Sequence, residues 1–279
     1  MIGPKINNES NQSTSMVKRA LIKGLVISAG LFRPAYSVYR YLNWPELCRF
    51  RQELSFYSTL LEPGSICFDV GANIGKKSEI FLKLGMTVVA FEPQSGCIRE
   101  LRARCGFAQK RLHTWQGVVG EKIGDVSLHL SEESNGQASL LADWEGTHAG
   151  TIRVPMTTLD DAIGKYGKPA YVKIDVEGYE LNVLKGLSSS VPLVSFEYHL
   201  REREINEVYN CLDCLSQFGE MQVNLVPSNS MEFAFEKWRN LDEFRYAFPE
   251  DFRNRDGYFY GDIFVKTSSN GSFGFSHVI

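Results

Sequence analysis

The chain has 279 residues, with 30 basic and 33 acidic side chains and a formal net charge of −3. Hydrophobic residues make up 43% of it, which suffices for a packed core and excludes a mainly disordered protein. The pI near 6.0 argues against a general nucleic-acid-binding protein, whose binding domain is usually strongly basic. We therefore expect no nucleic acid among its partners.

The first 60 residues are expected to form an extension, with the main domain spanning residues 61–279. Residues 1–15 are rich in Asn, Ser and Thr, which predicts disorder. Residues 17–32 are basic and apolar, but Lys23 interrupts the apolar run, which is shorter than the roughly 20 residues of a transmembrane helix. Two alternatives stay open: a helix that packs on the main domain, or an amphipathic helix in peripheral contact with a membrane surface.

The next part of the chain alternates between strand-like and helix-like segments. Short apolar runs at residues 65–70, 87–91 and 112–115 are typical of buried strands. Helices are indicated between them at residues 76–84 and 97–104. Such alternation predicts a parallel sheet, because the crossover between parallel strands is usually a helix.

The middle of the chain interrupts this alternation. Residues 125–130 and 151–156 alternate apolar and polar side chains with period two, and the stretch between them is rich in Ser, Gly and Asn. That pattern is typical of antiparallel strands. We therefore expect these strands to be inserted into the parallel fold.

The alternation then resumes and completes the predicted sheet. Further strands are expected at residues 171–175, 193–197, 221–226 and 261–266, and helices at about 179–187 and 204–218. The predicted fold class is α/β: a Rossmann-like fold whose mostly parallel seven-stranded sheet carries helices on both faces, with the inserted antiparallel strands and an N-terminal helical extension.

The ends of the first two strands carry groups suited to a nucleoside-bearing ligand, which in such sheets binds at the carboxyl ends of the strands. The first strand runs into the glycine turn Asp69-Val70-Gly71-Ala72-Asn73-Ile74-Gly75. The second ends in Glu92, about 20 residues later, where an acid can accept hydrogen bonds from ribose hydroxyls.

The glycine spacing helps to choose the cofactor. A dinucleotide site needs G-x-G-x-x-G, whereas here only Gly71 and Gly75 occur, and Asp69 would repel a pyrophosphate. The acid suits the amino group of S-adenosylmethionine (SAM). Two alternatives are kept: an NAD-dependent oxidoreductase that shares the Glu92 ribose contact, and a non-catalytic binding protein that retains the fold.

Four segments resemble the FkbM-type methyltransferase family: residues 68–75, 91–93, 158–160 and, most specifically, Lys173-Ile174-Asp175-Val176-Glu177-Gly178-Tyr179-Glu180. The resemblance implies a class I methyltransferase fold, SAM as methyl donor, and O-methylation of sugars or other hydroxylated metabolites. It also implies a cofactor-binding set, in which the first four residues line the methionine end and Glu92 holds the ribose: Asp69, Gly71, Asn73, Gly75, Glu92, and in the same turns Ala72 and Pro93. Residues 116–118 hold no acid, so no adenine contact is assigned.

A sugar hydroxyl is a poor nucleophile, so a base that removes its proton would help the transfer. The predicted catalytic residues are Asp175, Glu177 and His199, and Glu197 is a further candidate at the same sheet edge. The alternative for Asp175 and Glu177 is a structural role at the start of the following helix. Asp175, Glu197 and His199 do not match a recognised ligand motif, so no metal is predicted.

Acceptor specificity is expected from the parts added to the scaffold. One is the insertion at residues 131–150, which includes Asn135, Gln137, Ser139, Trp144 and His148. The other is the stretch containing Trp238, Phe244, Tyr246, Phe248, Phe252 and Tyr258. The expected partner is a hydroxylated small molecule or glycan. Six irregularly spaced cysteines do not form a disulfide framework, which favours a reducing, cytoplasmic compartment.

Overall fold

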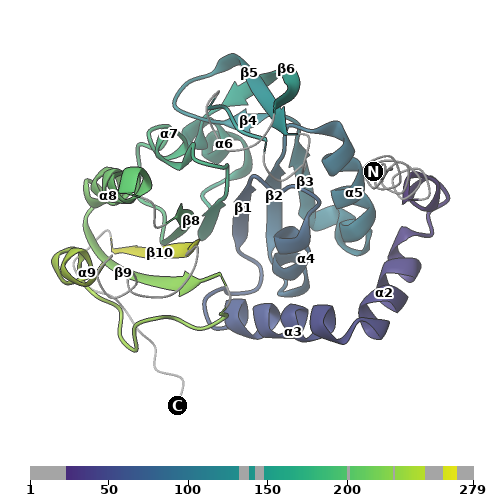
Figure 1. The fold of residues 1–279 in the computed structure, drawn as a ribbon, viewed down its shortest axis with the longest axis horizontal. Coiled ribbons are helices and arrows are strands. Elements are labelled where there is room, and N and C mark those ends of the chain that lie inside the picture. Colours follow the sequence, from purple (N-terminus) through teal and green to yellow (C-terminus); the bar gives the residue numbers. More distant parts are fainter. Residues whose placement is uncertain are drawn as a thin grey trace, which may run out of the picture.

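A twisted sheet of seven strands runs through the middle of the protein, in the order β3-β2-β1-β7-β8-β10-β9 (Figure 1). The computed structural model describes residues 23–131, 138–141, 148–199, 202–228, 230–248 and 260–268. Within them, the strands of this sheet are β1 Ile66–Val70, β2 Thr87–Phe91, β3 Leu112–Trp115, β7 Tyr171–Ile174, β8 Leu193–His199, β9 Glu220–Pro227 and β10 Tyr260–Ser268.

The strands β3, β2, β1, β7 and β8 run parallel to one another, and β10 is antiparallel to both β8 and β9. The sequence-based prediction of a mostly parallel seven-stranded sheet is therefore confirmed. Strand β10, the last described strand of the chain, lies between β8 and β9 in the sheet.

Helices cover both faces of the sheet, also as predicted. The helices are α3 Trp44–Ser58, α4 Lys76–Lys83 and α5 Ser95–Cys105 on one face, and α6 Leu159–Tyr166, α7 Glu180–Leu184, α8 Glu202–Ser216 and α9 Leu241–Ala247 on the other. The side chains of successive strand residues point to opposite faces of the sheet. Cys67 and Val88 pack under α4 and α5, whereas Phe68 and Val89 belong to the opposite cluster. A short 3-10 helix, η1 Gly106–Arg111, leads from α5 to β3.

A second, three-stranded sheet is inserted between β3 and β7. Its strands are β4 Val118–Val119, β5 Gly124–Ser131 and β6 His148–Thr157, in the order β4-β6-β5. The antiparallel pairing of β5 with β6 confirms the predicted insertion. The two-residue β4, which pairs with β6 in parallel, was not predicted.

The described part of the N-terminal extension is helical. Residues 23–28 are helical, and α2 Phe32–Leu42 and α3 follow. Helix α3 begins at Asn43, whose side chain accepts a hydrogen bond from the Glu46 backbone N–H, and it buries Phe56 and Tyr57 in the core. The predicted disorder of residues 1–15 lies outside the described residues. In the part of the chain that is described, no helix has the length and apolar character needed to cross a bilayer.

Candidate functional site

The glycine turn after β1 has a backbone that only a few residue types adopt readily. Gly71, Asn73 and Gly75 have φ of 81°, 48° and 78°. The backbone N–H groups of Gly71 and Ala72 both donate to the carbonyl of Phe91 at the end of β2. A Cβ at Gly71 would lie 1.7 Å from the carbonyl oxygen of Asp175, so the turn sits directly against the end of β7.

Glu92 stands at the end of β2 and holds this turn. Its Oε2 accepts the N–H of Asn73 at 2.9 Å, and its Oε1 accepts the N–H of Gln94 at 2.8 Å. The side chain is almost fully buried, and burial raises the pKa of Glu92 to about 7 although the two N–H groups favour the charged form. A carboxylate oxygen has two lone pairs, so each oxygen can accept one more hydrogen bond.

A cavity of about 890 Å³, counting its open mouth, lies beside Glu92. Its floor is formed by the turn after β1, the end of β2 and the turn after β7. The inserted sheet and its loops cover it through Val118, Val119, Leu128 and Leu140. The combination of an apolar cover with a carboxyl-lined floor suits an adenosyl group.

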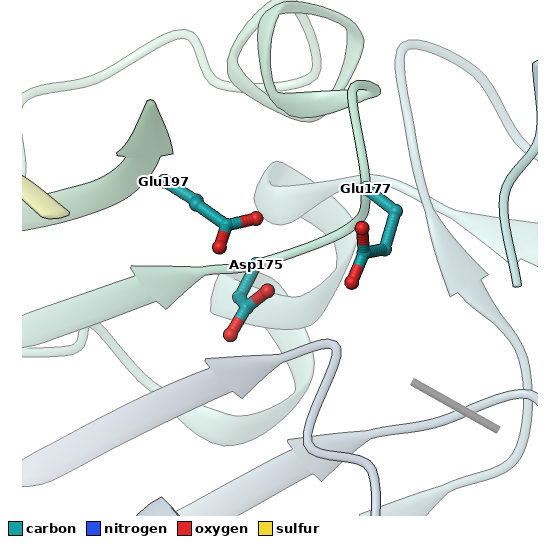
Figure 2. Close-up of side chains that lie close together, drawn as sticks. All are labelled: Asp175, Glu177 and Glu197. Atoms are coloured by element: carbon teal, nitrogen blue, oxygen red, sulfur yellow. The ribbon is translucent and has the colours of Figure 1, made fainter. Parts of the chain in front are cut away.

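Three carboxyl groups meet at the far side of this cavity. Asp175 follows β7, Glu177 lies in the next turn with φ of 55°, and Glu197 is on β8. One carboxylate oxygen from each lies within 4.8 Å of the others. In Figure 2 the three side chains point into one common space. We call these residues the carboxyl cluster.

A buried cation fixes one member of the carboxyl cluster. The Nζ of Lys173 donates to Oδ2 of Asp175 at 2.6 Å. Lys173 is only 2% exposed; burial disfavours its charge, but the carboxyl groups of Asp175, Asp262 and Asp69 outweigh this and raise the pKa of Lys173. The ammonium group therefore stays charged and holds Asp175 in one orientation.

Burial disfavours the charge of another member of the carboxyl cluster, Glu197. Burial raises the pKa of Glu197 to about 10, and repulsion from Asp175 and Glu180 acts in the same direction. Glu197 is therefore protonated at neutral pH and can donate a hydrogen bond. Oxygen ligands of this kind bind divalent cations. The Lys173 contact of Asp175 disfavours a metal, whose absence stays our prediction.

Glu180 holds the turn that carries the carboxyl cluster. Its Oε1 accepts the N–H groups of Val176 at 3.1 Å and Gly178 at 3.3 Å. Burial raises the pKa of Glu180 to about 7. The roles of Glu180 and Lys173 were not predicted from the sequence, although both residues lie in the segment 172–180. The signal that could have found them is a charged residue in a buried strand, or close after one.

His199 was predicted as a catalytic residue, but it is not among the described residues that line the cavity. Its Nε2 lies 3.4 Å from Oε2 of Glu197, and its ring stacks on Tyr260 with centroids 5.9 Å apart. The structure thus brings Asp175 and Glu177 together with Glu197, whereas His199 contacts Glu197 without lining the cavity.

Asp69 lies below the glycine turn, not in the cavity. It is 1% exposed, and its Oδ2 accepts a hydrogen bond from Ser78 at 2.5 Å. Burial raises its pKa, and Lys173 and Ser78 oppose the shift. Asp69 borders a second hollow together with Ala72, Lys76 and other residues. The two hollows share Gly71, Asn73 and Asp175, which places all three at the boundary between them.

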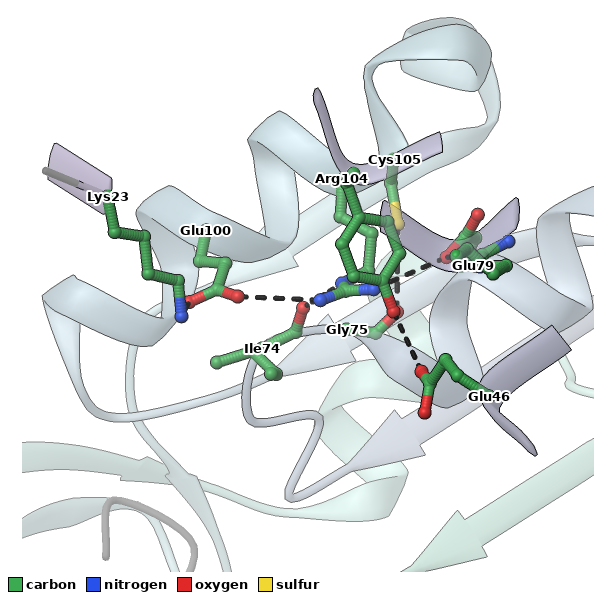
Figure 3. Close-up of polar contacts among 10 residues, drawn as sticks. Lys23, Glu46, Ile74, Gly75, Glu79, Glu100, Arg104 and Cys105 are labelled. Carbon is green, nitrogen blue, oxygen red and sulfur yellow. Dashed lines mark hydrogen bonds and ion pairs between the residues drawn. The ribbon is translucent and has the colours of Figure 1, made fainter. Parts of the chain in front are cut away.

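The two remaining predicted cofactor residues, Pro93 and Gly75, differ in where they lie. Pro93 lines the cavity with Glu92. Gly75 lines neither hollow; a Cβ there would lie 2.6 Å from Cγ of Leu101, so the glycine permits close packing of α5. Arg104 of α5 donates to the carbonyl of Ile74 at 3.0 Å and thereby secures the turn (Figure 3).

The regions expected to set acceptor specificity are only partly described. Asn135, Gln137 and Trp144 lie outside the described residues, as do Phe252 and Tyr258, and the side chain of His148 is not described. Ser139 is buried and its Oγ donates to the carbonyl of Glu177 at 2.8 Å, so it anchors the insertion to the carboxyl cluster's turn.

The aromatic residues described in the second region mostly pack against other rings. Phe244 and Phe248 are buried in the core, where their rings stack. Trp238 packs on Phe233, and Tyr246 is 91% exposed. Phe244 of α9 and Phe248, which follows this helix, thus fill the core, and a role of this region in acceptor specificity stays a prediction.

Comparison with known proteins identifies relatives. Residues 69–244 match the model of the methyltransferase FkbM domain. The hexuronic acid methyltransferase AglP of Haloferax volcanii is 29% identical over 138 residues, which are 48% of this chain and 55% of that protein. The chain thus matches about half the length of this curated relative.

Two solved structures with a similar arrangement are distant from this chain in sequence. The TehB-like SAM-dependent methyltransferase of Corynebacterium glutamicum is 10% identical, with 84% of this chain and 100% of that chain covered and a TM-score of 0.41. Precorrin-6y C5,15-methyltransferase of Geobacter metallireducens is 9% identical, with 77% and 88% covered and a TM-score of 0.40.

Proposed function

Because the chain belongs to the FkbM methyltransferase family, we propose that it transfers a methyl group from SAM to a hydroxyl oxygen of a sugar or another hydroxylated metabolite. The fold is that of the class I SAM-dependent methyltransferases, and SAM is the methyl donor. The family match does not support the alternative of an NAD-dependent oxidoreductase. The oxygen acceptor rests on the carboxyl cluster and on the relative that is named for a hexuronic acid.

We place the adenosyl part of SAM in the cavity beside Glu92. The free lone pairs of Glu92 suit the two ribose hydroxyls, and the apolar cover from the inserted sheet suits the adenine ring. The methionine part would pass along Gly71 and Asn73, which line both the cavity and the second hollow. There Asp69 suits its amino group, and Lys76 suits its carboxylate.

The observation that carries the proposal is the carboxyl cluster at the edge of this cavity. SAM supplies the methyl group as an electrophilic carbon on a sulfonium. As the acceptor O–C bond forms and the C–S bond breaks, the hydroxyl proton must pass to a base. Glu177 or Asp175 accepts it, and protonated Glu197 donates a hydrogen bond that orients the acceptor oxygen. His199 would help to position Glu197, since its Nε2 lies 3.4 Å from Oε2 of Glu197.

The charge of the cavity suggests which sugars fit. Among the described residues, its lining includes the acids Glu92, Asp175, Glu177 and Glu197 but no Lys or Arg. A uronate would meet carboxyl groups without a cation to pair with, and unpaired buried charge is costly. We therefore favour a neutral hydroxylated sugar over the hexuronic acid named for the relative.

Incubation with methyl-labelled SAM and matched sugars tests the proposal. Neutral hexoses, the corresponding uronic acids and their oligosaccharides are compared, and products are located by mass spectrometry. We expect label on a hydroxyl oxygen, more on neutral sugars than on uronic acids. Tight SAM binding with no transfer to any hydroxylated acceptor would favour the second candidate, a non-catalytic binding protein. Calorimetric titration with NAD should give no binding heat.

We also infer a reducing compartment, the cytoplasm, for this activity. All six cysteines are free thiols, and four of them are buried in the core. Burial raises the pKa of Cys67 and Cys105, which keeps these thiols protonated and unreactive. The proposal is tested by fractionating cells that produce the full chain.

A further inference from the structure

Helix α2 carries an apolar face that points away from the protein. Residues spaced for one side of a helix are all exposed there: Leu31, Pro34, Ala35, Val38, Tyr41 and Leu42. Val38 is 59% exposed, and Tyr41 and Leu42 are 77% and 76% exposed. We call these six residues the α2 outer face. Trp44, 65% exposed at the start of α3, continues it.

The opposite side of α2 is fixed to the main domain, so the helix cannot turn to bury this face. Phe32 is buried and Tyr36 donates from its hydroxyl to Glu46 at 2.9 Å. Arg40 donates to Glu79 of α4 at 2.6 Å, and Glu79 also pairs with Arg104 (Figure 3). Phe32, Tyr36 and Arg40 follow each other at i, i+4 spacing, which places them on one side of the helix. At about 100° per residue, the α2 outer face is centred roughly opposite.

The sequence around α2 is strongly basic. Between residues 10 and 45 it contains no Asp or Glu, but five basic residues: Lys18, Arg19, Lys23, Arg33 and Arg40. Of those that the structure describes, Lys23 pairs with Glu100 and Arg40 with Glu79, whereas Arg33 is exposed on α2. The chain as a whole has a net charge of −3. Among the described residues that follow, Arg49 and Arg51 of α3 are also exposed. A monomeric protein rarely leaves an apolar helix face in water without a partner for it.

We propose that the α2 outer face binds the surface of an anionic phospholipid bilayer. Leu, Val, Tyr and Trp side chains insert at the boundary between headgroups and acyl chains, and the exposed Arg33, Arg49 and Arg51 attract anionic headgroups. A second copy of the chain fits less well, because a two-fold contact would bring two positively charged segments together. This assignment is independent of the methyl acceptor.

Vesicle sedimentation with the full chain tests the proposal. Phosphatidylcholine vesicles are compared with vesicles containing phosphatidylcholine and phosphatidylglycerol at about 3:1. We expect the protein to sediment with the anionic vesicles and to be released as NaCl rises from about 50 mM to about 300 mM, because salt screens the attraction. No sedimentation, or equal binding to both vesicles, would overturn the proposal.

Matched variants assign the binding to the α2 outer face. A triple variant, Val38→Ser, Tyr41→Ser and Leu42→Ser, should bind anionic vesicles roughly tenfold less, since it removes most of the inserted apolar area. The control, Ile123→Ser with Tyr246→Ser, changes side chains that are 69% and 91% exposed elsewhere and should bind within about twofold of wild type. Circular dichroism melts confirm that both variants fold.

Two further outcomes would contradict the proposal. Equal loss of binding in the control variant would mean that general surface hydrophobicity, not the α2 outer face, drives the association. Light scattering without vesicles gives the oligomeric state. A wild-type dimer that the triple variant converts to a monomer would show that a second copy covers the face.

Discussion

At the residue scale, the site depends on carboxyl groups that differ in what holds them. Glu92 accepts two backbone N–H groups, Asp175 is held by Lys173, and Glu197 is protonated. Glu92, Asp175 and Glu177 could be found from the sequence, because each follows a recognisable strand and lies at the sheet's carboxyl edge. Lys173 and Glu180 could not be assigned, since their roles depend on contacts between segments whose distance the sequence does not give.

The Glu92→Gln variant should bind SAM about 10- to 100-fold more weakly, because a charge-assisted hydrogen bond contributes about 1.5–3 kcal/mol. For wild type, affinity should fall as the pH drops through about 7, where Glu92 gains a proton and can accept fewer hydrogen bonds. Isothermal titration calorimetry measures both effects. Glu220→Gln, an exposed change on β9, is the matched control. Unchanged affinity in Glu92→Gln would remove Glu92 from the ribose site.

The Asp175→Asn variant should lose turnover, by about 100-fold or more if Asp175 takes the proton, and lose SAM affinity much less. The amide keeps the size of the side chain but cannot act as a base. Steady-state kcat with a labelled acceptor is compared with the calorimetric Kd for SAM. Glu177→Gln is measured beside it, and the variant with the larger loss in kcat identifies the base. Wild-type kcat in both variants would make these carboxyl groups structural.

At the element scale, the strands of the large sheet were easier to predict from the sequence than the short elements between them. The apolar runs predicted the strands of the large sheet well, because strands buried on both faces read as continuous hydrophobic segments. The predicted helix at residues 179–187 proved to be α7 Glu180–Leu184, followed by single turns closed by the N–H groups of Gly186 and Leu187. The two-residue β4 carries no periodic signal, so it could not be predicted.

Gly71→Ala should destabilise the fold by more than about 3 kcal/mol, or prevent folding, because φ is 81° and the new Cβ would lie 1.7 Å from the Asp175 carbonyl oxygen. Gly164→Ala in α6 is the matched control. No atom lies within 4 Å of its Cβ position, and alanine there should stabilise the protein by about 0.5–1 kcal/mol. Urea unfolding followed by circular dichroism gives both values. Equal stability of the two variants would contradict the close approach of the turns after β1 and β7.

At the scale of the whole molecule, buried acids make stability depend on pH. Burial raises the pKa of Glu92 and Glu180 to about 7, of Glu197 to about 10, and also raises that of Asp69 and Asp262. Between the ordinary pKa of a carboxyl group and these higher values, the folded protein binds more protons than the unfolded chain. The free energy of unfolding must therefore fall as the pH rises through this window.

Without SAM, the urea midpoint should be higher at about pH 5.5 than at about pH 8. Lys173 does not reverse this trend, because its raised pKa stabilises the fold throughout this range and its contribution fades only at higher pH. The Glu197→Gln variant, which cannot titrate at that position, should show a shallower decline. A midpoint that rises from pH 5.5 to pH 8 would contradict the burial of these acids as the main cause.

The most direct test of the site is a crystal structure of the protein with S-adenosylhomocysteine, the product that SAM leaves after methyl transfer. The account predicts both ribose hydroxyls within hydrogen-bond distance of Glu92, and the sulfur atom on the side that faces Asp175, Glu177 and Glu197. A ligand bound elsewhere, or bound with its ribose away from Glu92, would contradict it.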